Sequence, residues 1–276
     1  MPPARVLLWF LSFASLGLAV RAFTVEPPPI WVTTALLLLL ATWATLGALF
    51  PGLRIYADLI TRLPVGKRRV ALTFDDGPHP ETTREVLRLL ESRGAKATFF
   101  VVGRKAERYP DVLREIVAAG HAVGLHGYRH DRLYSLRSSR YVVEDIARSQ
   151  DAIERVCGQR PALFRPPIGF VSHLTAIAVE RAGVTLAGWS VRALDGVRGA
   201  TAARVAARVL PRIEDGAIVM LHDAAEREDY SPVSLEVLPA VLERVAELGL
   251  ETALLEPTPP PRTGADRART PARSRE

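Results

Sequence analysis

The stretch Ala71-Leu72-Thr73-Phe74-Asp75-Asp76-Gly77-Pro78 decides how the rest of this chain is interpreted. It begins as a short apolar run with alternating residues, the pattern of a buried strand. It ends at two adjacent carboxylates followed by Gly-Pro, which cannot continue a strand. Two like charges at a strand end repel each other, whereas a plain turn needs only one aspartate. A cation shared with other ligands is therefore the better interpretation, and a simple Asp-Asp-Gly turn is the alternative.

On either side of this stretch, from residue 67 to residue 256, short apolar strands alternate with amphipathic helices. The predicted strands are residues 70–74, 97–102, 122–125, 162–164, 185–190, 217–221 and 252–255. The helical patterns between them mostly stop at glycines, which are common helix terminators. Such alternation indicates an α/β fold, with a mostly parallel sheet covered by helices.

The spacing of the polar residues favours a small or incomplete barrel over an open doubly wound sheet. Different predicted strands are followed by different polar residues, namely Asp75-Asp76, His126, Arg165, Asp195 and His222. A barrel brings the carboxyl ends of its strands together on one face, where its chemistry lies. An open sheet would gather fewer of these side chains.

Two apolar runs precede the barrel, and residues 1–52 are predicted to form two transmembrane helices. Residues 6–20 carry no charge and follow Arg5, and residues 30–50 form a second uncharged run. The second run has the roughly 20 residues needed to cross a bilayer. A signal peptide is the alternative for the first run, and a buried core hairpin is the alternative for the pair. Residues 53–66 are then a linker to a catalytic domain at residues 67–256.

Basic residues flank the two runs unevenly, with most of them on the side of the catalytic domain. The positive-inside rule therefore favours a cytoplasmic catalytic domain. Large domains are also exported against this bias, so the predicted location is the cell membrane, with the side of the domain left open.

Composition excludes several other classes of protein. The chain has 276 residues, of which 48% are hydrophobic and 24% charged, as in a globular protein. Cys157 is the only cysteine, so neither an internal disulfide nor a cysteine-based metal site is possible. The net charge is +6, and residues 257–276, predicted to be a disordered tail, hold five arginines against two acidic residues. No basic patch with interleaved aromatics appears, so no nucleic-acid partner is expected. The sequence makes no prediction of oligomeric state.

A histidine pair follows the third predicted strand, at His126 and His130. Residues four apart on a helical start face the same way. Two histidines and one carboxylate suit Zn²⁺ or another divalent metal such as Co²⁺. No fourth protein ligand is evident, and an open coordination position is typical of a catalytic site.

These motifs resemble those of the NodB-homology polysaccharide deacetylases, carbohydrate esterase family 4, over roughly residues 67–256. Residues 73–78 match the first family motif in full, and residues 126–130 match the second except at Gly127. Residues 164–169 match the third, residues 189–195 resemble a degraded fourth, and residues 219–223 resemble the fifth. The resemblance implies a distorted seven-stranded barrel.

The resemblance also implies metal-assisted hydrolysis of an N-acyl group on an amino sugar. Asp76, His126 and His130 would hold the metal, most likely zinc, which activates water and polarises the acyl oxygen. Asp75 would be the general base, held ionised and oriented by Arg165. His222 would protonate the leaving amine, with Asp195 orienting its imidazole. The oxyanion would contact the metal and a backbone N–H near Ile168.

The chain departs from the family pattern at several positions. Gly127 replaces a Ser/Thr that steadies the metal loop, which predicts weaker metal retention. Ile168 stands where an aromatic usually follows the prolines, Arg192 replaces the first Asp of the fourth motif, and Gly196 replaces its Trp. Loss of this Trp predicts an open site and a substrate other than a plain chitin-like chain. The predicted substrate-binding residues are Pro167, Ile168, Tyr128, Trp189 and Met220, and other candidates for the groove are His79, Tyr134 and Tyr230.

Three function hypotheses follow. The first is a membrane-anchored deacetylase of cell-envelope polysaccharide, which requires the catalytic domain outside the cytoplasm. The second is a deacylase of a lipid-linked sugar at the membrane surface, which fits the positive-inside bias and the open groove. The third is an inactive carbohydrate-binding module, against which the joint presence of the metal-binding and acid–base residues argues.

Overall fold

The computed structural model describes residues 1–227 and 230–257, so most of the predicted tail lies outside the described residues. A curled parallel sheet forms the centre of the molecule, with strands in the order β5-β4-β3-β2-β1-β7-β6. β8 pairs only with the start of β1. The strands are β1 (Arg69–Asp75), β2 (Ala97–Val101), β3 (Ala122–Leu125), β4 (Leu163–Phe164), β5 (Thr185–Leu186), β6 (Val191–Arg192), β7 (Ile218–His222) and β8 (Glu251–Thr252). This seven-strand half-barrel confirms the predicted fold class.

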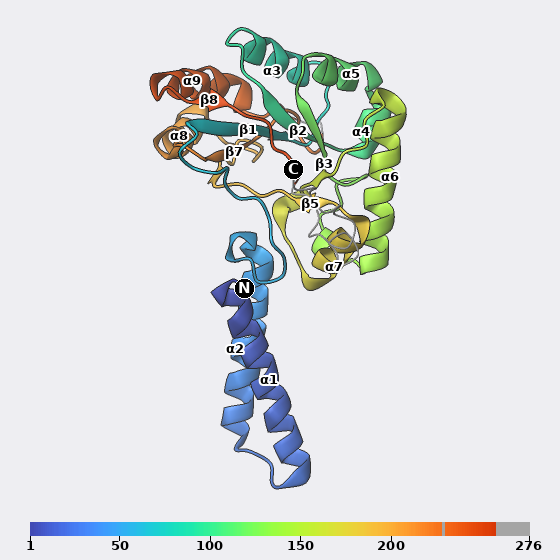
Figure 1. The fold of residues 1–276 in the computed structure, drawn as a ribbon, viewed down its shortest axis with the longest axis vertical. Helices are drawn as coiled ribbons and strands as arrows, with labels where there is room; N and C mark the ends of the chain where they lie inside the picture. Colours follow the sequence, from blue (N-terminus) through green and yellow to red (C-terminus); the bar gives the residue numbers. More distant parts are fainter. Residues whose placement is uncertain (228–229, 258–276) are drawn as a thin grey trace, which may run out of the picture.

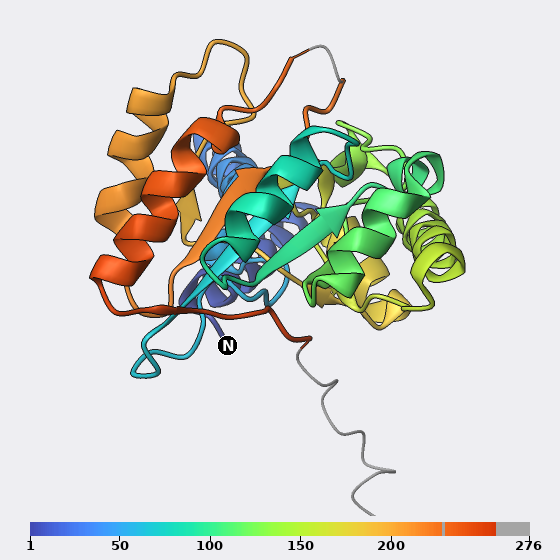
Figure 2. The same ribbon diagram turned by 90° about the horizontal axis from the view of Figure 1, so that it is seen from above.

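Helices surround the outer face of the sheet (Figures 1 and 2). They are α3 (Thr82–Glu91), α4 (Gly103–Arg108), α5 (Pro110–Ala118), α6 (Ser139–Cys157), α7 (His173–Ala182), α8 (Ala202–Val209) and α9 (Ser234–Glu247). Ser138, Ser172 and Thr201 cap the starts of α6, α7 and α8, where each side-chain oxygen accepts a backbone N–H. Short 3₁₀ turns lie at η1 (Pro51–Leu53), η2 (Tyr134–Leu136), η3 (Pro167–Gly169) and η4 (Leu210–Arg212).

The sheet has the predicted number of strands along the barrel, but one member differs. Of the predicted strand at residues 185–190, only residues 185–186 form β5, and β6 follows at residues 191–192 as a separate strand beside β7. The predicted strand at residues 252–255 becomes the two-residue β8, which lies off the barrel path. β6 has only two residues, and one of them is the exposed Arg192, so it carries no periodic apolar signal.

The interior of the half-barrel is apolar except near the carboxyl ends of the strands. Leu72, Phe74 and Phe99 are fully or almost fully buried, and the rings of Phe74 and Phe99 stack. Arg165 is also completely buried, although arginine is rarely buried without a partner. The partners that allow this buried charge lie at the carboxyl ends of the strands.

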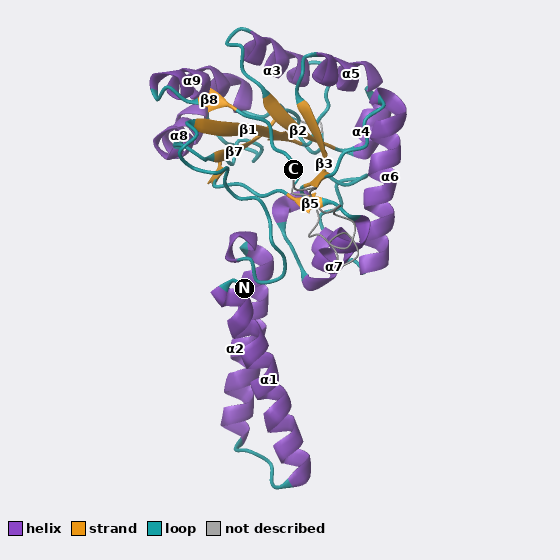
Figure 3. Ribbon diagram, viewed as in Figure 1, coloured by secondary structure: helices purple, strands orange, loops and turns teal. Residues whose placement is uncertain are grey.

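An apolar hairpin projects from the barrel (Figures 1 and 3). It consists of α1 (Pro3–Thr24) and α2 (Ile30–Leu49), both long and apolar enough to cross a membrane. Only 6% of each helix's most apolar 18-residue window is buried inside the protein. A core hairpin would bury its apolar side chains, so the two helices are candidate membrane spans, and a signal sequence near the N-terminus has the same length and apolar character.

The segment after the hairpin packs against the barrel, although residues 53–66 were predicted only as a linker. Leu59 is buried in the barrel core, whereas Ile55 lies against Gly47 of α2. Ile60 forms a parallel bridge with Ala187 at the end of β5, and the Leu63 N–H donates to the Gly216 carbonyl. The first contact extends the sheet beyond β5, and the second attaches the segment just before the start of β7.

Candidate active site

The carboxyl end of β1 carries the two adjacent aspartates, and its neighbours in the sheet bring the other polar side chains to them. Asp75 is in register with His222 on β7. The chain turns at Asp76, which has a left-handed φ of 74°. Because of this turn, the two consecutive carboxylates point at different partners around the strand end. In a continuing strand they would simply lie on opposite faces of the sheet.

Asp223 holds the turn that follows. Its carboxylate accepts the Gly77 N–H at 3.1 Å and the Thr83 hydroxyl. A Cβ atom at position 77 would fall on this carboxylate, so only glycine fits there. Burial raises the pKa of Asp223 to about 7, although its hydrogen bond from Thr83 acts in the opposite direction.

Three buried side chains form a candidate metal centre. The Nε2 atoms of His126 and His130 lie 3.3 and 3.0 Å from Asp76 Oδ1. This oxygen is buried and has no hydrogen-bond partner among the residues that the structure describes. One ligand atom from each residue lies within 4.8 Å of the others. An orphaned carboxylate oxygen facing two imidazoles is the donor set that a divalent first-row metal requires, so these residues fit the metal that the sequence predicts.

The second nitrogen of each imidazole faces another oxygen. His126 Nδ1 lies 2.8 Å from the Arg165 carbonyl oxygen, and a proton on Nδ1 leaves Nε2 free to bind a metal. His130 Nδ1 lies 3.4 Å from a Glu226 carboxylate oxygen. Burial alone would lower the pKa of His130, but Asp76 and Glu226 outweigh it and raise that pKa to about 9. The site therefore favours a cation at this point.

Asp75 pairs with the buried Arg165 beneath it. The Arg165 guanidinium donates to Asp75 Oδ1 at 2.6 Å and to the Thr73 hydroxyl at 2.9 Å. Its remaining donors reach the Gly188 carbonyl oxygen at 2.7 Å and the Ala187 carbonyl oxygen at 3.4 Å. This set of bonds compensates the buried guanidinium charge and fixes the orientation of the Asp75 carboxylate.

His222 and Asp195 form a second pair on the opposite side of β1. His222 Nδ1 lies 2.9 Å from Asp195 Oδ1, and the His222 backbone N–H donates to Asp195 Oδ2 at 2.8 Å. Burial would lower the pKa of His222, but Asp195, with smaller effects from Asp76 and Asp75, raises it to about 10. The imidazole is therefore held protonated at neutral pH.

The predicted substrate-binding residues do not all lie in one place. Pro167 and Ile168 form η3, with Ile168 at a φ of 64°, and Trp189 packs over Gly169 beside them. Met220 is buried on β7 next to the site strands.

Tyr128 lies away from this group. Its hydroxyl donates to Glu107 at 2.7 Å, and Arg148 stacks on its ring. The structure thus places Tyr128 between α4 and α6 and gives no support to its predicted place in the groove.

The other groove candidates have different surroundings. Tyr134 is fully buried against Phe164 and Tyr141, so it is a core residue. His79 contributes to the start of α3, where its N–H donates to the Thr83 hydroxyl at 2.8 Å. The Tyr230 hydroxyl donates to the carbonyl of Gly196, which follows Asp195 in the chain. Of the three, only Tyr230 lies next to the site.

Sequence reasoning missed two carboxylates that support the metal loop. Glu226 contacts His130 from the loop after β7, and Asp145 on α6 accepts the Tyr128 N–H at 2.9 Å. Asp145 also lies beside Gly127, whose carbonyl accepts the Gly103 N–H at 3.0 Å. Neither carboxylate belongs to a strand-end motif, so their contacts with the metal loop become evident only in the folded structure. Weaker metal retention caused by Gly127 stays a prediction.

Comparison with known proteins agrees with this arrangement. Residues 62–187 match the family model described as polysaccharide deacetylase. The chain is 32% identical over 159 residues to a peptidoglycan-N-acetylglucosamine deacetylase of Bacillus cereus, covering 58% of this chain and 57% of that one. It is 36% identical over 176 residues to a chitooligosaccharide deacetylase of a Bradyrhizobium species, covering 63% of this chain and 77% of that one.

A solved structure extends the comparison to the fold. A family 4 acetyl xylan esterase from Clostridium thermocellum, in complex with a cobalt ion, superimposes with a TM-score of 0.62 and 30% identity. The match covers 67% of this chain and 87% of that one. Against the Bacillus cereus enzyme, in contrast, the match spans little more than half of that protein's length.

Proposed function

This chain belongs to the polysaccharide deacetylase family, and from that premise we propose that it is a metal-dependent hydrolase of an N-acetyl group on a cell-envelope amino sugar. The observation that carries the proposal is the convergence of Asp76, His126 and His130 next to the Asp75–Arg165 pair. Related chains named as deacetylases of peptidoglycan and of chitooligosaccharides support the reaction class and the carbohydrate substrate. An inactive binding module would have no need to keep this buried charge arrangement.

Asp76, His126 and His130 would hold the metal, for which zinc is our choice and cobalt the alternative. When bound, the metal supplies a Lewis acid for the amide oxygen and lowers the pKa of an attacking water. Asp75 takes the proton from that water, since Arg165 holds its carboxylate next to the metal ligands. The role of Arg165 is to position this base.

His222 donates a proton to the nitrogen of the leaving amine. Asp195 binds its Nδ1, so that Nε2 is the atom that faces the substrate. A protonated imidazole at neutral pH suits an acid, because an amine leaves only when its nitrogen is protonated. The proposed base thus lies at the end of β1 and the proposed acid at the end of the neighbouring β7.

The N-terminal hairpin is proposed to anchor the protein in the cell membrane. Two adjacent apolar helices with exposed side chains support an anchor, and a signal sequence is the alternative for the first helix. The substrate would then be a glycan close to the membrane. Because Gly196 lacks the aromatic wall of the family, we retain the proposal that a plain chitin-like chain is a poor substrate.

The test is acetate release by the full-length protein in detergent, supplied with zinc or cobalt. Substrates are peptidoglycan fragments, N-acetylglucosamine oligomers and a lipid-linked N-acetylated sugar. We expect metal-dependent release that Asp75→Asn reduces by several orders of magnitude while metal binding is kept. Metal binding without release from any substrate would contradict the proposed reaction. Rapid turnover of chitin oligomers would contradict the proposed substrate preference.

A further inference from the structure

A pocket lies where the N-terminal hairpin meets the catalytic face, outside the residues assigned to metal binding and proton transfer. Its volume is about 470 Å³. One wall comes from the end of α2 and from η1, and the other from the loops that follow β4 and β5. Its lining residues include Phe50 and Leu53 on the first wall, and Ala187, Gly188, Trp189 and Arg192 on the second. We call it the junction pocket.

The two walls of the junction pocket are bonded to each other. The Val171 N–H, just after the third motif, donates to the Ala48 carbonyl in the last turn of α2 at 3.2 Å. The Ile60 N–H donates to the Leu186 carbonyl, and the Gly188 N–H donates to the Ile60 carbonyl. The pocket is therefore a fixed feature of the fold.

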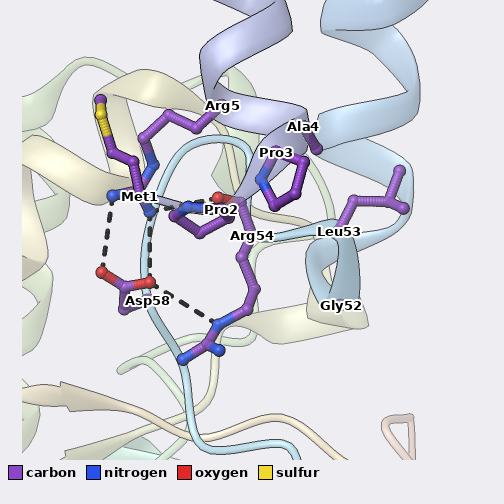
Figure 4. Close-up of a pocket in the computed structure, with 9 residues that line it drawn as sticks. All are labelled: Met1, Pro2, Pro3, Ala4, Arg5, Gly52, Leu53, Arg54 and Asp58. Atoms are coloured by element: carbon purple, nitrogen blue, oxygen red, sulfur yellow. Dashed lines mark hydrogen bonds and ion pairs between the residues drawn. The ribbon is translucent and has the colours of Figure 1, made fainter.

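The start of α1 is attached at the same place. Figure 4 shows a neighbouring pocket that shares Gly52 and Leu53 with the junction pocket. In it Arg5 and Arg54 both pair with Asp58, at 3.4 and 3.6 Å. Arg5 also donates to the Ile55 carbonyl at 3.1 Å. Both helices of the hairpin thus hold the segment that forms the outer wall.

The outer wall is apolar and lies on the membrane side. Phe50 and Leu53 expose 57% and 39% of their surface, and they directly follow the 20-residue apolar helix α2. With the hairpin in a bilayer, the mouth of the pocket lies at the boundary between hydrocarbon and water. A hydrocarbon chain from that layer reaches the pocket without crossing water.

The inner wall is separated from the proposed base Asp75 by the side chain of Arg165. Ala187 and Gly188 line the pocket, and their carbonyls accept hydrogen bonds from the guanidinium of Arg165, which pairs with Asp75. Trp189 lies between Arg165 and Arg192, with its ring 5.7 and 5.6 Å from their guanidinium carbons. Arg192 is the one charged residue among the described lining residues.

We propose that the junction pocket holds the hydrocarbon chain of a substrate lipid in which a phosphate joins the chain to the N-acetylated amino sugar. Going outward from the metal ligands, the protein offers first the proposed base Asp75, then the guanidinium of Arg192, then the apolar junction pocket. Such a lipid offers its groups in the matching order: the sugar that bears the amide, the phosphate and the hydrocarbon chain. Arg192 is the residue placed to bind the phosphate. This inference rests on the proposed deacetylase function and names its substrate class.

The test measures KM for acetate release by the full-length protein in lipid nanodiscs. Three probes share N-acetylglucosamine: a decyl phosphodiester, a methyl phosphodiester and an uncharged decyl glycoside. Each buried methylene contributes roughly a fourfold gain in affinity, so we expect the decyl phosphodiester to have a KM at least about tenfold below that of its methyl counterpart. The decyl glycoside should fall between them.

Substitutions then locate the chain. Leu53→Asp puts a charge on the pocket wall and is expected to abolish the difference between decyl and methyl phosphodiesters. Val65→Asp, at a 70% exposed position outside the pocket, is the matched control and should keep the difference. Arg192→Gln should raise the KM of the decyl phosphodiester severalfold and leave that of the decyl glycoside unchanged.

The outcomes separate this inference from the proposed function. Turnover of the methyl probe with no gain from the chain would overturn the inference and leave the deacetylase intact. A gain that survives Leu53→Asp would show that the chain binds elsewhere and would also overturn it. An equal effect of Arg192→Gln on both decyl probes would overturn the phosphate assignment. No release from any probe would overturn the proposed function itself.

Discussion

Asp75 and Asp76 are adjacent in sequence but serve different partners in the structure. Asp75 pairs with Arg165 below it, and Asp76 faces two imidazoles above the strand end. The left-handed backbone at Asp76 makes this division possible. The backbone conformation at Asp76 therefore decides which partner each of the two carboxylates reaches.

The Asp195→Asn variant tests the acid assigned to His222. Asp195 is the largest influence that raises the pKa of His222, so its loss should lower that pKa. His222 is active when protonated, and the protonated form would then disappear at a lower pH. We expect the alkaline limb of the pH–kcat profile to move to lower pH, measured at constant metal concentration. An unchanged limb would contradict His222 as the acid.

Glu226→Gln tests the support of a metal ligand. Contacts from His130 and Arg132 lower the pKa of Glu226 to about 2, so it is ionised at neutral pH and attracts the proton on His130 Nδ1. Loss of such a partner typically weakens metal binding about 10- to 100-fold. Competition with a chromophoric chelator measures this affinity directly. Glu144→Gln, on an exposed carboxylate of α6, is the control, and equal affinities of both variants would exclude the role.

At the residue scale, sequence reasoning identified the strand-end side chains because each follows a recognisable apolar strand. The structure brings Asp76, His126 and His130 together, and it pairs Asp75 with Arg165 and His222 with Asp195. The groove roles of Tyr128 and Tyr134 stay predictions, and the structure packs Tyr128 between α4 and α6 and Tyr134 in the core. Glu226 was missed because its contact with His130 spans 96 positions of sequence and involves no motif.

At the element scale, the turn after β1 depends on a loop far away in the chain. The Asp223 carboxylate occupies the space where a side chain at position 77 would lie. Gly77→Ala must push β1 and the β7 loop apart, which typically costs about 1–3 kcal/mol. We expect a lower thermal midpoint together with weaker metal binding.

Gly52→Ala is the control for that substitution, because no atom lies within 4 Å of a Cβ at position 52. Calorimetry of both variants gives the comparison. A Gly77→Ala protein with the stability and metal affinity of the control would show that the turn tolerates displacement.

Element lengths explain which parts of the sheet were predictable. β1 and β2 have seven and five residues and are almost entirely buried, so their apolar runs are clear in the sequence. β6 has two residues, one of them exposed, and owes its pairing to β7 and to the closure of the barrel. Short strands of this kind are specified by tertiary contacts and not by local pattern.

At the scale of the whole molecule, residues 54–66 belong to the catalytic fold. Leu59 is buried in the main apolar core, and burial of such a side chain contributes about 1.5–3 kcal/mol. A fragment of residues 67–257 should therefore melt about 5 °C below one of residues 54–257. Circular dichroism on heating measures this, and equal midpoints would show that the segment is only a tether.

The hydrogen bonds between the hairpin and the barrel limit how far from the membrane the active site can meet a substrate. A flexible tether would let an active site sweep through a volume above the membrane, whereas this one is held at a fixed height. Once the hairpin is inserted, encounters are confined to lateral diffusion in a thin layer. With the proposed deacetylase activity, the protein would then modify amides in that layer and leave identical amides farther from the bilayer unchanged.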